Sequence, residues 1–259
     1  MSEEEGERKE GKSEREEKTI TIKKDDLWKY STFVLIAVVV IGALVMFSGN
    51  DGNTGTGGAV NTGEGAVVDI SPFLSNSQLY PSLGPDDSEN VVIEFSDFQC
   101  PFCAMAAGLA SWTEGYKSQY GDLIGSAKNV EDLAEQGQLR LIYVPWSFLG
   151  TESNNAAEAA LCANDQGKFW EMHGAIFTAH DGEENNGKYD KDKLEIIAAG
   201  ISGIDTAKFN SCLEDSDYTS SLQRISSDVR GAGVSGTPTF LVNGQKVSAS
   251  WPAIQAALK

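Results

Sequence analysis

Two cysteines with two residues between them offer the most reactive chemistry in this chain of 259 residues. Cys100 and Cys103 enclose a Pro-Phe dipeptide, in a sequence with four cysteines in all. A metal site needs further ligands, but there is no second Cys-x-x-Cys, and the two histidines, His173 and His180, lie seventy or more residues away. A passive crosslink over so short a loop removes little chain entropy. The spacing therefore favours thiol–disulfide exchange.

The residues around the pair give its two thiols different roles. Pro101 is typical of a first helical position, so the Cys100 sulfur is expected to face the unpaired N–H groups and positive dipole of a helix start. Both favour the reactive thiolate, and Cys100 is predicted to be the nucleophile. Cys103 follows one helical turn later and deeper, and is predicted to be the resolving thiol.

Two further positions supply candidate catalytic groups. Glu94 is the one acid in the apolar run 91–95. It either points outward at a sheet edge, or is a buried acid that relays a proton when Cys103 ionises. The dipeptide Thr237-Pro238 precedes a predicted hairpin, where the proline marks a turn or an edge, or forms a cis peptide bond. The residues alone leave open whether this proline faces the cysteine pair.

The first 65 residues change composition twice. Residues 1–29 carry eight Lys/Arg and ten Asp/Glu, and are predicted to be disordered. Residues 30–48 hold no charged side chain, and about 20 residues at 1.5 Å each span a hydrocarbon core, so we predict a transmembrane helix. Residues 49–65 contain seven glycines and are predicted to be a flexible linker.

A cleaved signal peptide and a buried soluble helix are the alternatives to this membrane anchor. The long leader and the absence of an Ala-x-Ala site after the apolar run disfavour cleavage, and no polar residue interrupts the run. Lys23, Lys24 and Lys29 precede the span, whereas Asp51 is the first charge after it. The positive-inside rule then places the N-terminus in the cytoplasm and everything after residue 50 outside the cell membrane.

The predicted outer part is acidic, with 12 Lys/Arg against 28 Asp/Glu after residue 29. This balance argues against binding to nucleic acid or anionic lipid. All four cysteines lie in this part, in surroundings where disulfides persist. Cys162 and Cys212 are fifty residues apart, and a bond between them would contribute on the order of 3 to 4 kcal/mol. Two free buried thiols or a second redox site are the alternatives.

Hydrophobic patterning predicts the elements that position these residues. Extended runs occur at 66–70, 91–95 and 139–144, and on both sides of Asn243-Gly244, which is a type I′ hairpin signal. Helical patterns follow the cysteine pair, fill about 151–231 and close the chain. Without the helical block, a minimal sheet of four strands remains. The domain 66–259 is therefore predicted to be α/β with a helical insertion.

Three motifs, VVIEFSDFQCPFCAM, AALCANDQGKFWEMH and GVSGTPTFLVNGQKV, in this order and spacing, resemble the DsbA-like thiol:disulfide oxidoreductases of the thioredoxin superfamily. The resemblance covers about residues 80–259 and implies a thioredoxin-like fold. It also implies that Pro238 is the cis-proline beside the active-site disulfide, that Thr237 contacts the sulfurs, and that Glu94 is the family's buried acid. Phe102 departs from the Pro-His of the best-known oxidases, because its ring cannot stabilise a thiolate.

The sequence therefore predicts a membrane-anchored, extracytoplasmic enzyme that introduces disulfides into exported proteins with free thiols. The resemblance implies reoxidation by a quinone-linked membrane partner of the DsbB or vitamin-K-epoxide-reductase type, with no diffusible cofactor. A reductase or isomerase on the same fold is one alternative. A thioredoxin-like holdase or copper-binding module is the other.

Overall fold

The computed structural model describes residues 67–259 of the chain. The predicted charged segment 1–29, transmembrane helix 30–48 and linker 49–65 all lie outside this range. From residue 67 onward, no helix combines the length and the hydropathy that crossing a membrane requires.

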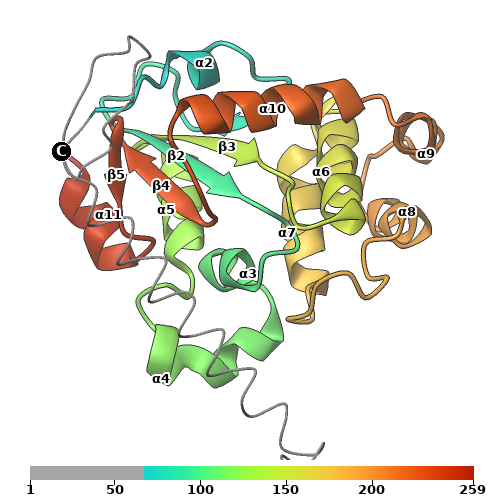
Figure 1. Ribbon diagram of the computed structural model, residues 1–259, viewed down its shortest axis with the longest axis horizontal. Helices are drawn as coiled ribbons and strands as arrows, with labels where there is room; N and C mark the ends of the chain where they lie inside the picture. The colour runs from blue at the N-terminus through green and yellow to red at the C-terminus, as the bar shows by residue number, and fades with distance from the viewer. Residues whose placement is uncertain (1–66) are drawn as a thin grey trace, which may run out of the picture. The chain divides into compact units, whose positions relative to one another are not determined.

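A mixed five-stranded sheet lies at the centre of the described residues (Figure 1). Its order is β1-β3-β2-β4-β5, with β2 and β3 parallel and the other neighbours antiparallel. The strands are β1 (Ser82–Leu83), β2 (Val91–Ser96), β3 (Arg140–Pro145), β4 (Thr239–Val242) and β5 (Gln245–Val247). The central strands β2 and β3 are buried on both faces, which explains the near-continuous apolar runs that predicted them.

Helices cover both faces of this sheet, as expected for the α/β class. Figure 1 shows α10 along one face and α3 and α5 on the other. The helices are α2 (Ser71–Leu74), α3 (Pro101–Ala107), α4 (Lys117–Tyr120), α5 (Ser126–Glu135), α6 (Thr151–Asn164), α7 (Phe169–Ala179), α8 (Lys191–Ala199), α9 (Thr206–Asp215), α10 (Thr219–Gly231) and α11 (Trp251–Ala257), with a 3-10 helix, η2, at Ser111–Tyr116. This mixed sheet between helical layers is a thioredoxin-like arrangement.

The predicted hairpin and the predicted helical insertion are both present. Asn243 and Gly244 join β4 to β5 with φ values of 52° and 81°, the left-handed pair that a type I′ turn requires. Helices α6 to α10 form the insertion between β3 and β4.

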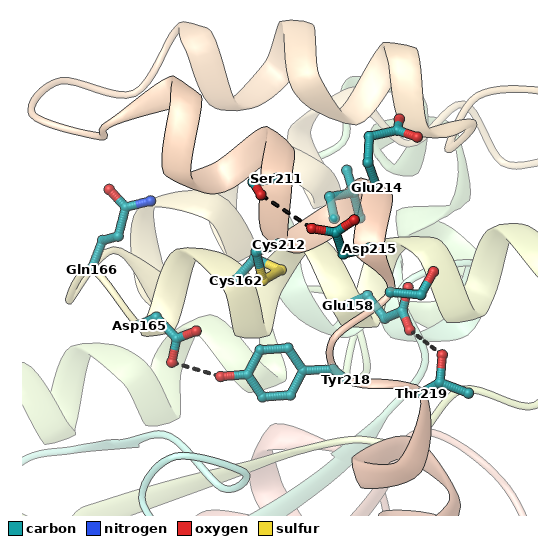
Figure 2. The surroundings of a disulfide bond; sticks show 12 residues. Glu158, Cys162, Asp165, Gln166, Ser211, Cys212, Glu214, Asp215, Tyr218 and Thr219 are labelled. Carbon is teal, nitrogen blue, oxygen red and sulfur yellow. Dashed lines mark hydrogen bonds between the residues drawn. A yellow bond between two sulfur atoms is a disulfide. The ribbon is translucent and has the colours of Figure 1, made fainter.

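A disulfide stabilises this insertion. Cys162 of α6 and Cys212 of α9 are bonded, with their Cα atoms 5.9 Å apart (Figure 2). Beside the bond, the Tyr218 hydroxyl donates a hydrogen bond to Asp165 at 2.6 Å. Together these contacts hold α9 and the approach to α10 against α6.

Several predicted boundaries are wrong. Of the predicted strand 66–70, residue 66 lies outside the described residues, and residues 67–70 form no strand, since Val67 makes only an isolated bridge to Gln245. The helix that begins after Cys100 is only seven residues long and ends at Gly108, which has a φ of 67°. Gly108 also packs closely on Gly125, because a Cβ added to Gly108 would lie 2.9 Å from the Cα of Gly125. The sheet has a fifth strand, the two-residue β1, and α5 lies in a segment where no helix was predicted.

Candidate functional site

The cysteine pair lies at the start of α3, just beyond the end of β2. Cys100 is the N-cap residue, with extended backbone (φ −68°, ψ 120°), and Pro101 occupies the first turn. Both cysteines are free; Cys100 retains 6% of its surface, whereas Cys103 is fully buried. A thiol arriving from outside therefore meets Cys100 first.

The surroundings of Cys100 stabilise its thiolate. A hydrogen bond from the Cys103 thiol lowers the pKa of Cys100 from 9.0 to about 7, against the opposing effect of burial. Thr237 and the backbone N–H groups at the helix start lower this pKa further by smaller amounts. Burial, and then the neighbouring Cys100, raise the pKa of Cys103 well above its usual value. Cys100 therefore ionises more readily than a free thiol, while Cys103 keeps its proton at neutral pH.

The Thr237-Pro238 segment lies beside Cys100, and the peptide bond between its two residues is cis. The Cys100 thiol donates a hydrogen bond to the backbone carbonyl of Thr237 at 3.6 Å, although 137 residues separate them. The Thr237 hydroxyl is buried without a hydrogen-bond partner among residues 67–259. It is therefore free to donate to the Cys100 thiolate.

Glu94 is buried in the middle of β2, so the outward-facing interpretation is wrong. The residue is 1% exposed, and neither carboxyl oxygen has a hydrogen-bond partner in the described part of the chain. Burial, followed by the charge of Glu131, raises the pKa of Glu94 from 4.5 to about 8. Glu94 therefore holds its proton at neutral pH.

Two polar residues that the sequence analysis did not single out lie close to Glu94. Ser96 projects from the same face of β2, and its hydroxyl is near enough to lower the pKa of both Glu94 and Cys103. Tyr143 is the register partner of Glu94 on β3. The period-two pattern of β2 points to Ser96, whereas finding Tyr143 requires knowledge of the strand pairing.

Asp97 was also missed, and it fixes the loop that leads to Cys100. Its buried carboxylate accepts four hydrogen bonds of 2.5 to 3.2 Å, from the N–H groups of Gln99, Phe148 and Leu149 and from the Ser153 hydroxyl. The next anchor is His180, whose Nε2 lies 3.0 Å from the Gln99 carbonyl oxygen. The sequence signal that could have identified Asp97 is the presence of polar residues in the apolar stretch before the cysteines.

Replacing Asp97 with alanine is expected to lower the free energy of unfolding by about 2 kcal/mol, because buried donors lose their acceptor. Urea denaturation of the purified protein measures this loss. The matched control is Asp87→Ala, since Asp87 is exposed and makes no hydrogen bond to any residue from 67 to 259. Equal losses in both variants would contradict the anchoring role of Asp97.

Phe102 adds an apolar surface beside Cys100. Its ring is 45% exposed and lies 5.6 Å from the ring of Tyr120, which is 6.4 Å from that of Tyr116. These three residues form an aromatic patch at the mouth of the site. Between residues 67 and 259, no three His, Cys, Asp or Glu side chains are gathered as a metal site would require.

Comparison with known proteins gives the family. A family model described as thioredoxin matches residues 124–259, just over half of the chain. A relative named "Probable disulfide bond formation protein D", from Bacillus anthracis, is 24% identical over 179 residues, which are 68% of this chain and 76% of that protein. An Na(+)/H(+) antiporter, NhaA 1 from Salinispora arenicola, is 32% identical over 181 residues, but this chain spans only 24% of its length.

The solved structures show the same fold. The crystal structure of oxidised BdbD from Bacillus subtilis has a TM-score of 0.56 at 20% identity, and the match covers 70% of this chain and 92% of that one. A thioredoxin-like oxidoreductase from Silicibacter pomeroyi has a TM-score of 0.52 at 25% identity, with 70% and 94% covered. The chain thus belongs to the thioredoxin family, as a DsbA-like thiol:disulfide oxidoreductase.

Proposed function

We propose that this protein is a membrane-anchored, extracytoplasmic oxidase that introduces disulfides into exported proteins through Cys100 and Cys103. The observation that carries the proposal is the difference between the two thiols. The accessible Cys100 has a lowered pKa, whereas the buried Cys103 has a raised one. Stabilising the Cys100 thiolate stabilises the reduced pair, and this makes the disulfide oxidising.

The proposed reaction starts from the Cys100–Cys103 disulfide. A substrate thiolate attacks the Cys100 sulfur, and the bond to Cys103 breaks as a mixed disulfide forms. Cys103 leaves as a thiolate and takes the proton of Glu94. A second substrate thiolate then attacks the substrate sulfur, which releases Cys100 as a thiolate and the substrate as a disulfide. Two electrons pass from the substrate to the cysteine pair.

The surface around Cys100 suits unfolded clients. The aromatic patch offers apolar contact that does not depend on a particular sequence, and the Thr237 hydroxyl and carbonyl lie beside the reacting sulfur. The name of the Bacillus anthracis relative supports the oxidative direction. A quinone-linked membrane partner of the DsbB or vitamin-K-epoxide-reductase type would take the two electrons and restore the disulfide.

A reductase is the second candidate, and the value of one pKa favours it. The pKa of Cys100, about 7, is close to that of reducing thioredoxins and higher than that of the strongest oxidases. Phe102 has no donor that would lower it further.

The reduction potential of the Cys100/Cys103 pair distinguishes these candidates. The purified full chain is equilibrated in glutathione buffers, its free thiols are alkylated, and the peptide that holds both cysteines is quantified by mass spectrometry. An oxidase is expected at about −120 to −180 mV. A value near about −270 mV would replace the oxidase with an electron donor.

A further inference from the structure

A row of buried polar groups leads away from Cys103 on one face of the sheet. Glu94 and Tyr143 are register partners on parallel strands, so their side chains project from the same face. The Tyr143 ring centroid lies 4.8 Å from that of His173, on α7. Nδ1 of His173 lies in turn 3.4 Å from a carboxyl oxygen of Glu131, on α5. Residues from four elements, β2, β3, α7 and α5, thus form a continuous row between the two acids.

The inner groups of this row lack partners. Both Glu94 oxygens, the hydroxyls of Ser96 and Tyr143, and Nε2 of His173 are buried without a hydrogen-bond partner within residues 67–259. Each such group costs about 1 to 3 kcal/mol when it stays unpaired. Native proteins keep groups of this kind where they bind internal water or serve redox chemistry.

Glu131 forms the outer end of the row. Its side chain is 11% exposed, and Nζ of Lys128, 3.9 Å from its other oxygen, belongs to a side chain that is 37% exposed. The charged groups that face Glu131 are Lys128, Asp132 and Glu135 on its own helix and Glu94 on β2. Burial lowers the pKa of His173 to about 3, so its ring is neutral, and its Nδ1 faces the Glu131 carboxyl group at 3.4 Å.

The two acids also match in proton affinity. Burial raises the pKa of Glu131 from 4.5 to about 7, against about 8 for Glu94. Groups with such similar values exchange a proton in either direction at little cost.

We propose that Glu131, held by His173, is the outer end of a proton path that links Cys103 and Glu94 to the solvent. The proposal rests on the dithiol chemistry of the proposed function. Glu131 touches neither sulfur and acts through Glu94, so it is a positioning residue.

The path operates whenever Cys103 gains or loses its proton. When Cys103 attacks a mixed disulfide on Cys100, its sulfur bonds to the Cys100 sulfur and the outgoing thiolate leaves with the electron pair of the broken bond. The Cys103 proton passes to the Glu94 carboxylate, then through internal water to Glu131, and finally to the solvent. In the reverse direction the same groups deliver a proton to the buried Cys103 thiolate.

The test separates the two thiols in time. The full chain, with Cys100 and Cys103 reduced and Cys162–Cys212 intact, is mixed with dithiobis(nitrobenzoate) in a stopped-flow instrument. The first nitrothiobenzoate is released when Cys100 attacks the reagent, at a rate that depends on reagent concentration. The second is released when Cys103 attacks the mixed disulfide, and its rate is independent of concentration. Because Cys103 must lose its proton in order to attack, the rate of the second phase measures how readily that proton is removed.

Glu131→Gln is expected to slow the second phase roughly tenfold and to shift its pH profile, while the first phase stays unchanged. Glu131→Asp retains most of the rate. Formate in the buffer restores part of the rate of Glu131→Ala, which a merely structural role would not allow. The matched control, Glu89→Gln, removes the same charge from an exposed position that does not face Glu131 and is expected to change neither phase.

An unchanged second phase in Glu131→Gln would overturn the proton path and leave the proposed function intact. If instead the wild-type chain showed no second release, the dithiol chemistry itself would fail. Should Glu131→Gln not fold, the pH profile of Glu131→Asp decides, and an unshifted profile overturns the proposal.

Discussion

Cys100→Ser is expected to lower the rate of disulfide transfer on the order of a thousandfold or more, because serine cannot form the mixed disulfide. The measurement is the oxidation of a reduced, unfolded protein by the purified chain, followed by loss of free thiols. The structural disulfide Cys162–Cys212 lies in the insertion, with Cys162 buried and Cys212 partly buried, so it is not expected to substitute for the lost pair. Activity above one per cent of wild type in Cys100→Ser would contradict the assignment.

Cys103→Ser is the informative partner of this variant. It keeps the nucleophile but lacks the resolving thiol, so mixed disulfides with clients are expected to accumulate and to be visible on non-reducing gels. In Cys103→Ala the pKa of Cys100 is expected to rise above about 7, since the donor that contributes most to lowering it is lost. Thiolate absorbance against pH measures that rise. The double variant Cys100→Ser/Cys103→Ser is the control and traps nothing.

Glu94→Gln is expected to stabilise the oxidised protein at neutral pH while it slows catalysis. The folded chain holds the Glu94 proton up to a pKa of about 8, whereas the unfolded chain releases it near 4.5. The contribution of protonated Glu94 to the free energy of unfolding is therefore fully present below pH 4.5 and is lost as the pH rises through 8. At pH 7 the free energy of unfolding is lower by about 3 kcal/mol than it is below pH 4.5 because of this group. Glutamine has no proton to release, so Glu94→Gln does not lose this stability.

The measurement is the free energy of unfolding by urea at pH 4 and at pH 7. The oxidised form is used because Cys100 and Cys103 then do not titrate. The advantage of Glu94→Gln over wild type is expected to grow by about 3 kcal/mol between these two values. Glu89→Gln, at an exposed position just before β2, is expected to show no such growth. A pH-independent difference for Glu94→Gln would show that Glu94 is not held neutral by burial.

The features that the sequence predicted correctly have local signals. Asn243-Gly244 predicts its own turn, and the apolar run 91–95 and the helical periodicity of 151–231 give the central strand and the insertion. The order Cys-Pro-Phe-Cys likewise indicates redox chemistry before any fold is known. Glu94 was open to two interpretations because periodicity alone does not show whether a strand is central or at an edge.

The features that the sequence did not predict depend on packing between distant segments. Helix α5 is the exception: Ala127, Val130 and Ala134 are buried at helical spacing and give it a clear apolar stripe, a signal in its own sequence that the prediction did not use. His173 of α7, which lies beside Glu131 of α5, had been considered only as a metal ligand. Nothing in the sequence places Glu131 near Glu94, because the sheet and two helices must first assemble.

The distance of 137 residues between Cys100 and Thr237 has a consequence for biosynthesis. Translation yields the cysteine pair first, and the segment that contacts it follows only after β3 and the whole insertion have been made. In a growing chain, Cys100 and Cys103 are therefore present before the Thr237 carbonyl and hydroxyl that lie beside them in the folded protein. The competence to exchange disulfides is acquired when β4, which follows Thr237 and Pro238, joins β2, so the late synthesis of this strand sets the moment at which the enzyme starts to act.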